Sequence, residues 1–289
     1  MIIDAHLHVW NPATASYPWL AGLDPIDREM RLAEILPAMR AAGVRATVLV
    51  QAADNADDTA NMLREADAHS EVVGIVAWVP LDKPDEAHRM LTELRRDRRV
   101  VGVRTLLHAH PDPAWVLRPN VDAGLGVLEA AEVTFDYVTG GPAALAHVPE
   151  ISQRHPNLSI VIDHLGKPPL GTDRSEWRSL ISAAAENPLV SAKLSGLYAS
   201  SGPLEHWRVD DVRAIVDDAL EIFGPQRLLV GSDWPIALLA GGYERTVTAL
   251  FAIASELSAA DRDALLGGTA GSIYRLDPAL LAAAGEDSA

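Results

Sequence analysis

Ile2-Ile3-Asp4-Ala5-His6-Leu7-His8-Val9-Trp10 opens the chain as an apolar run that carries two histidines separated by one residue. Alternate side chains of a β-strand share a face, so His6 and His8 are expected on one face, with Asp4 one layer deeper. Far along the chain, Gly231-Ser232-Asp233-Trp234-Pro235 follows another apolar run. Two imidazoles and a carboxylate at strand ends can hold a divalent ion or polarise a carbonyl, which favours a hydrolytic enzyme.

Apolar runs recur along the chain, and segments with helical spacing lie between them, one of them at residues 143–155. The eight predicted strands are residues 2–9, 46–52, 72–81, 100–107, 134–138, 159–164, 190–194 and 228–232. Continuous Val/Ile/Leu strands are typical of a parallel sheet that is buried on both faces. Eight such units in 289 residues predict one α/β domain, a single (β/α)8 TIM barrel, over residues 1–289. We expect residues 282–289 to form a flexible tail.

Composition excludes several classes of partner. The chain has 24 basic and 40 acidic residues, a net charge of −16, which argues against nucleic acid and anionic membranes. It has no cysteine, so disulfide scaffolds and thiolate metal sites are excluded. No secretory segment or membrane-length apolar run is recognisable, so a soluble cytoplasmic protein acting on a small molecule is expected. The acidic surface does not prevent a homodimer.

Polar residues gather at the predicted carboxyl ends of strands, where barrel enzymes build their active sites. They are His6, His8, Arg104, Asp136, Asp163, His164, Lys167, Lys193, Ser195 and Asp233. Two long connections, residues 11–30 and 108–120, follow the first and fourth strands. They carry the aromatic or polar residues Tyr17, Trp19, His108, His110 and Trp115. Taken alone, Asp233 reads as a helix N-cap and His164 as a core histidine. Their joint occurrence in an eight-unit pattern favours a catalytic mouth instead.

Four motifs together resemble the amidohydrolase superfamily, in particular its amidohydrolase 2 branch, which includes fucono- and rhamnono-lactonase types and a pyrone-dicarboxylate lactonase. The motifs are Asp4-Ala5-His6-Leu7-His8-Val9-Trp10, Asp163-His164-Leu165-Gly166-Lys167-Pro168, Lys193-Leu194-Ser195-Gly196-Leu197 and Gly231-Ser232-Asp233-Trp234-Pro235. The resemblance runs from Met1 to about Leu276. It implies a distorted (β/α)8 barrel that hydrolyses lactones, esters or amides of small molecules.

The resemblance also implies roles for individual residues. By motif match, His6, His8 and His164 are catalytic histidines, and Asp233 is the general base towards the attacking water. Binuclear relatives carry a bridging Lys or Glu on strand four and a His on strand five, where this chain has Arg104 and Asp136. A binuclear site is therefore not expected. Either one divalent ion, Zn or Mn, binds at His6, His8 and Asp233, or the enzyme works without a metal.

The favoured reaction is the opening of a sugar aldonolactone by an Asp-activated water. The residues predicted to bind substrate are Arg104, Trp10, Trp78, Asp136, Lys167 and Trp234. One alternative is a mononuclear metal-dependent decarboxylase or amide hydrolase, which the missing strand-five histidine disfavours. The other is a dicarboxylate (pyrone) lactonase, which would need several arginines at the mouth, where Arg104 is the one clear candidate.

Overall fold

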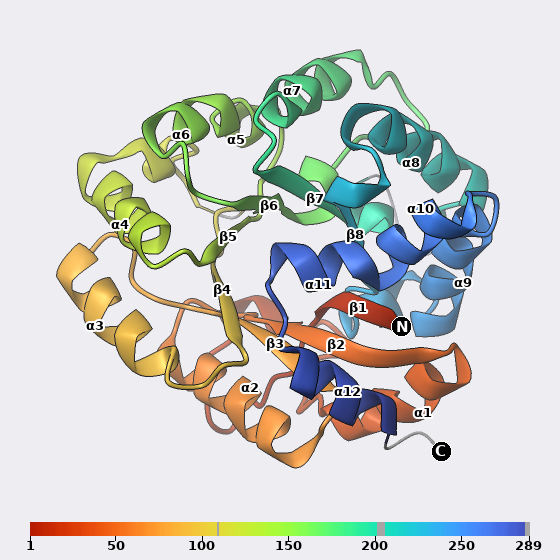
Figure 1. Cartoon of the computed structure of the whole chain (residues 1–289), viewed down its shortest axis with the longest axis horizontal. Coiled ribbons are helices and arrows are strands. Elements are labelled where there is room, and N and C mark those ends of the chain that lie inside the picture. Colours follow the sequence, from red (N-terminus) through yellow and green to blue (C-terminus); the bar gives the residue numbers. More distant parts are fainter. Residues whose placement is uncertain (109, 201–205, 287–289) are drawn as a thin grey trace.

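The computed structural model describes residues 1–108, 110–200 and 206–286, and eight parallel strands form its centre in the order β1 to β8 (Figure 1). The strands are β1 (Ile2–Leu7), β2 (Val44–Val50), β3 (Val72–Ala77), β4 (Val100–Thr105), β5 (Thr134–Tyr137), β6 (Ile160–Ile162), β7 (Val190–Leu194) and β8 (Leu228–Val230). The barrel closes just past the ends of β8 and β1, where Asp233 N–H donates to His6 O at 2.8 Å and His8 N–H donates to Trp234 O at 2.7 Å. The predicted (β/α)8 TIM barrel is confirmed.

Helices surround the strands as an outer ring (Figure 1). The α-helices are α1 (Leu32–Ala41), α2 (Ala56–Ala68), α3 (Pro84–Leu94), α4 (Pro119–Ala130), α5 (Pro142–Leu145), α6 (Val148–Arg154), α7 (Ser175–Ala185), α8 (Val209–Phe223), α9 (Tyr243–Ala254), α10 (Ala259–Asp263), α11 (Thr269–Ile273) and α12 (Pro278–Glu286). The single helix predicted at residues 143–155 is wrong, because α5 and α6 divide it. Pro149 lies in the first turn of α6 and lacks the N–H that a continuous helix would need there.

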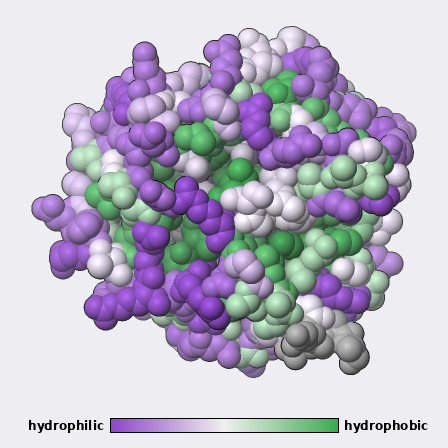
Figure 2. Space-filling view, viewed as in Figure 1, coloured by the Kyte–Doolittle hydropathy of each residue, from purple (hydrophilic) through white to green (hydrophobic). Residues whose placement is uncertain are grey.

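The amino-terminal end of the barrel is covered by the carboxyl-terminal segment of the chain. Ala284 of α12 is fully buried and packs in one cluster with Ile3, Val48 and Tyr274. The expected flexible tail therefore needs correction: residues 282–286 belong to α12, which an apolar contact with the barrel holds, and residues 287–289 lie outside the described residues. On this face, hydrophilic residues form much of the rim and hydrophobic residues are visible between them (Figure 2).

A bulge in β1 affects how its polar side chains are presented. Asp4 pairs with Thr47 and Leu7 with Leu49, so β1 uses one more residue than β2 over this interval. Such bulges bend a strand and redirect its side chains, and they are common beside active sites. Here the bulge spans His6, whose ring meets that of His8 beyond the strand end.

Candidate active site

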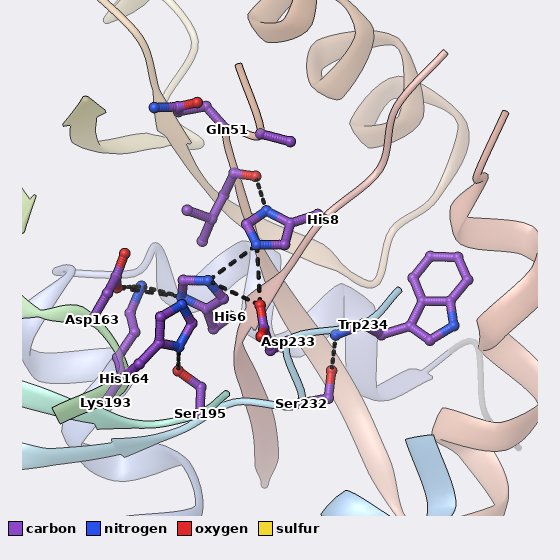
Figure 3. A network of polar contacts seen from close by, with 12 residues as sticks. His6, His8, Gln51, Asp163, His164, Lys193, Ser195, Ser232, Asp233 and Trp234 are labelled. Carbon is purple, nitrogen blue, oxygen red and sulfur yellow. Dashed lines mark hydrogen bonds and ion pairs between the residues drawn. The ribbon is translucent and has the colours of Figure 1, made fainter. Parts of the chain in front are cut away.

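His6, His8 and Asp233 meet at the floor of the barrel mouth (Figure 3). The two imidazole Nε2 atoms lie 3.2 Å apart. Oδ1 of Asp233 lies 3.3 Å from Nε2 of His8 and 3.7 Å from Nε2 of His6. All three side chains are buried, and His8 and Asp233 line a cavity of about 340 Å³. That volume is near the lower end of the roughly 300–1,000 Å³ range of small-molecule sites.

The hydrogen bond of His8 fixes its tautomer. Its Nδ1 lies 2.7 Å from the carbonyl oxygen of Val50, which can only accept, so Nδ1 carries the proton. In the neutral ring, Nε2 then presents a lone pair towards His6 and Asp233. A backbone carbonyl that orients a histidine in this way is the usual support for a ligand or catalytic imidazole.

Buried charges surround the other side of His6. Its Nδ1 lies 3.3 Å from Oδ1 of Asp163 and 3.1 Å from the ammonium of Lys193. Lys193 also pairs with Asp136 at 2.5 Å and with Asp163 at 3.1 Å, and Arg104 donates to Asp163 at 2.9 Å. These groups form a second layer below the imidazoles. Buried charges are tolerated only when they are paired in this manner.

Burial and neighbouring charges shift the pKa values of Asp233, His6 and His164. Burial raises the pKa of Asp233, but the charge of His164 and the hydrogen bond and charges of the strand-one histidines outweigh it, so the net pKa lies below its usual range. Burial, followed by the charge of Lys193, lowers the pKa of His6 well below 6.5. Burial likewise lowers the pKa of His164. The carboxylate of Asp233 is therefore favoured in its ionised form, whereas His6 and His164 are disfavoured as cations.

The three floor residues fit a divalent metal ion. Their ligand atoms all lie within 4.8 Å of one another. A tetrahedral zinc ion with Zn–N bonds of about 2.0–2.1 Å places neighbouring donor atoms about 3.3 Å apart, close to the separations of 3.2, 3.3 and 3.7 Å seen here. A ligand role for Nε2 of His6 requires the tautomer with the proton on Nδ1, and Oδ1 of Asp163 can accept a hydrogen bond from that N–H. His6, His8 and Asp233 thus form a site suited to one ion, whereas Lys193 and Asp136 fill the adjacent interior.

His164 reaches the site from an unusual turn after β6. His164 and Leu165 have φ values of 54° and 51°, in the left-handed region that costs non-glycine residues energy. Nδ1 of His164 lies 2.9 Å from Oγ of Ser195, and its ring packs edge-on against His6 at 4.7 Å. A Cβ at Gly196 would lie 2.5 Å from Nδ1 of His164, so only glycine allows this close approach.

The predicted substrate-binding residues divide into two groups. Arg104 and Lys167 line the cavity, although Arg104 is already paired with Asp163 and donates to Gln51 O. The other four, which do not line the cavity, are Trp10, Trp78, Asp136 and Trp234. For these four, contact with substrate stays a prediction that the lining of this cavity does not support.

The surroundings of these four residues differ. Trp10 is fully buried, and its Nε1–H donates to backbone carbonyls of the loop after β1, including Arg28 O at 2.8 Å. Asp136 is sealed under Lys193 and accepts from Tyr274 Oη at 2.7 Å. Trp78 follows the end of β3, and its backbone N–H donates to Thr59 Oγ1. Trp234 packs in the core, and its indole points away from the imidazoles (Figure 3).

Several functional positions were not among the residues predicted at the site. Trp19 and His108 line the cavity from the two long connections. Tyr198 donates from its hydroxyl to Oδ2 of Asp233 at 3.0 Å, and it comes from the turn after β7. The long loops were the only sequence signal for Trp19 and His108, and no local pattern marks Tyr198.

Comparisons with known proteins agree with this geometry. Residues 3–276 match the model of a family described as amidohydrolase. A Burkholderia multivorans protein named L-fucono-1,5-lactonase is 35% identical over 286 residues, which cover 95% of this chain and 96% of that protein. A crystal structure of an amidohydrolase from B. multivorans with bound HEPES is 32% identical, with a TM-score of 0.87 and coverage of 96% of this chain and 100% of that chain. One with bound Zn is 33% identical, with a TM-score of 0.86 and the same coverage. This chain belongs to the amidohydrolase family.

Proposed function

We propose that this protein is a lactonase that opens a sugar aldonolactone, with L-fucono-1,5-lactone as the first substrate to test. The observation that carries the proposal is the buried carboxylate of Asp233, 3.3 Å from Nε2 of His8 on the floor of a small cavity. Whole-length similarity to a protein named L-fucono-1,5-lactonase supports the choice of substrate. A strained ring ester is also easier to hydrolyse than an amide.

The reaction needs a base that lies close to the acyl carbon. With the lactone carbonyl above His6 and His8, Asp233 takes a proton from water as the water oxygen bonds to the acyl carbon. Collapse of the tetrahedral intermediate breaks the bond to the ring oxygen, and Asp233 returns the proton to that oxygen. The product is one open-chain hydroxy acid, whose carboxyl group ionises to a carboxylate and a proton. Tyr198 holds Oδ2 of Asp233 and leaves Oδ1 facing the histidines.

Hydrogen bonds and the second layer of buried charges hold the histidines in this arrangement. Val50 O orients His8, and Asp163 with Lys193 surrounds Nδ1 of His6. His164 contacts Ser195 through Nδ1, and its ring packs edge-on against the ring of His6. A divalent ion held by His6, His8 and Asp233 would supply Lewis-acid polarisation of the carbonyl.

The lining of the cavity suits a substrate with one apolar and one polar side. Its apolar side chains are Trp19, Leu23, Ala52, Leu106, Val138, Ile236 and Leu239. The polar groups His8, Arg104, His108, His164, Lys167 and Asp233 share the same cavity. Because Asp163 and Gln51 already engage Arg104, the cavity offers little for two substrate carboxylates. This favours a neutral polyol lactone over a dicarboxylate.

A proton-release assay over a panel of lactones tests the proposal. The panel should include L-fucono-1,5-lactone, other aldonolactones and a pyrone dicarboxylate, each with chelated enzyme and after addition of Zn²⁺ or Mn²⁺. We expect one sugar lactone to be hydrolysed at least a hundredfold faster than in buffer alone. Absence of hydrolysis of every lactone under all metal conditions would overturn the proposal and direct attention to decarboxylation or amide hydrolysis.

Location and partners complete the proposal. Among the described residues, no helix is long and apolar enough to cross a bilayer. We propose that the protein acts in the cytoplasm and without nucleic acid, since its net charge of −16 repels polyanions. A homodimer is the assembly to test, and light scattering on the purified protein distinguishes it from a monomer.

A further inference from the structure

Lys167 places an ammonium group beside the proposed reaction centre without a carboxylate partner. It ends the turn after β6 with a φ of 59°, and its backbone N–H donates to His164 O at 2.8 Å. Its half-buried side chain lines the cavity together with His8, His164 and Asp233. In the described part of the chain, no hydrogen bond or ion pair engages its ammonium.

The other interior cations of the site are already paired. Arg104 lies 2.9 Å from Asp163, and Lys193 lies 2.5 Å from Asp136. Partial burial of a charge without a counter-ion costs free energy, and burial accordingly lowers the pKa of Lys167, with the charge of Asp233 opposing it. A ligand that brings a negative charge into the cavity would remove this cost.

Ring opening creates such a charge. The lactone is neutral, whereas the product that leaves the site is a carboxylate. Its charge lies on the oxygens of the acyl carbon that the water attacked. Asp233, itself ionised, and a chain with a net charge of −16 both repel this anion. A cation that faces the cavity beside Asp233 is therefore needed to hold the acyl oxygens once they are charged.

We propose that Lys167 is the anion-binding residue of the site and holds the carboxylate that ring opening produces. His108 lines the same cavity, and its imidazole offers a further hydrogen-bonding group there. This inference rests on the proposed lactonase function. It adds that the site binds the product anion more tightly than a neutral polyol.

Calorimetric binding tests this preference without turnover. The probes are L-fuconate, the product of the proposed substrate, and L-fucitol, a neutral polyol with the same carbon chain. For Lys167→Gln we expect the Kd for L-fuconate to rise at least tenfold and the Kd for L-fucitol to change less than twofold. Lys167→Arg, which keeps the charge, should bind L-fuconate within about threefold of the wild-type protein. Lys83→Gln, an exposed lysine in an ion pair with Glu86, is the matched control and should change neither value.

The outcomes separate this inference from the proposed function. If another lactone proves to be the substrate, its own aldonate and alditol replace the two probes. Unchanged L-fuconate binding in a folded Lys167→Gln variant would overturn the anion site, as would an equal loss for both probes. If no lactone is hydrolysed, the lactonase proposal fails, whereas charge-dependent binding of an aldonate would still support Lys167 as an anion site. Thermal unfolding of each variant verifies that it is folded.

Discussion

The ammonium of Lys193 lies 3.1 Å from Nδ1 of His6, and both side chains are fully buried at the centre of the barrel. Lys193 also neutralises Asp136 of β5 and Asp163, which directly follows β6. One cation thus joins three strands to the imidazole that contacts Asp233. The charges of the second layer set both the stability of the barrel and the orientation of His6.

Removal of this cation should be costly. In Lys193→Met, Asp136 and Asp163 lose their shared partner, and loss of one partner of a buried pair typically costs about 3–5 kcal/mol. Urea unfolding should show a loss of this size, and adding Asp136→Asn to Lys193→Met should recover part of it by removing one unpaired charge. Equal stability of the single and double variants would contradict the pairing of Lys193 with Asp136.

Asp233→Asn should remove the proton acceptor while preserving the fold. General acid–base catalysis contributes about 10²–10⁴-fold, so kcat on the hydrolysed lactone should fall by at least about a hundredfold. The melting temperature should change little, because Tyr198 can still donate to the amide oxygen. Asp217→Asn, an exposed change on α8, is the control with unaltered kcat. A fully active Asp233→Asn enzyme would disprove the assignment of the base.

Metal uptake should depend on the three floor residues and not on His164. After chelation, the wild-type protein should bind one Zn²⁺ per chain in elemental analysis and calorimetry. His8→Gln should weaken binding by at least tenfold because it removes one of three protein ligands. His164→Gln should still bind one ion, since His164 contacts Ser195. Equal zinc binding by wild type and His8→Gln would argue against this site.

The pH profile should lack an acid limb near the usual histidine pKa. Burial lowers the pKa values of His6 and His164, so these imidazoles lose their neutral form only as the pH falls below those lowered values. Asp233 stays ionised, because its net pKa lies below its usual range. We expect kcat/KM to be flat from about pH 6 to 8. An acid limb centred at about pH 6.5 would show that an unshifted imidazole controls the reaction.

Trp19 should contribute to substrate binding more than to chemistry. Its indole N–H donates to Ala52 O at 2.8 Å and its ring packs edge-on against Trp10, which fixes its position on the apolar wall. Trp19→Ala should raise KM about tenfold, about 1.4 kcal/mol, with kcat within threefold, and Trp19→Phe should recover most of the loss. Trp115→Ala is the control: the ring of Trp115 packs against His110 and does not line the cavity, so KM should be unchanged. An unchanged KM in Trp19→Ala would remove Trp19 from the substrate site.

Local pattern was enough to predict the barrel and the residues at its floor. Parallel strands that are buried on both faces must be apolar throughout, so their runs stand out, and polar residues at their carboxyl ends are conspicuous. His6, His8, His164 and Asp233 could be proposed for this reason, and the structure brings all four together. The division of one predicted helix into α5 and α6 shows where helical spacing alone was insufficient.

Tertiary structure alone decided which side chains face the cavity and which are sealed beneath it. Asp136 and Arg104 occupy equivalent positions at strand ends, yet Lys193 and Tyr274 enclose Asp136, whereas Arg104 lines the cavity. Trp10 was predicted to bind substrate, but backbone carbonyls of the loop after β1 hold it in the core. Trp19 lines the cavity instead. The sequence alone determined the strands and the polar residues at their ends, because strand formation depends on local side-chain patterns. The contacts of each polar side chain depend on residues that are distant in the chain, and the closed barrel brings these within hydrogen-bonding distance.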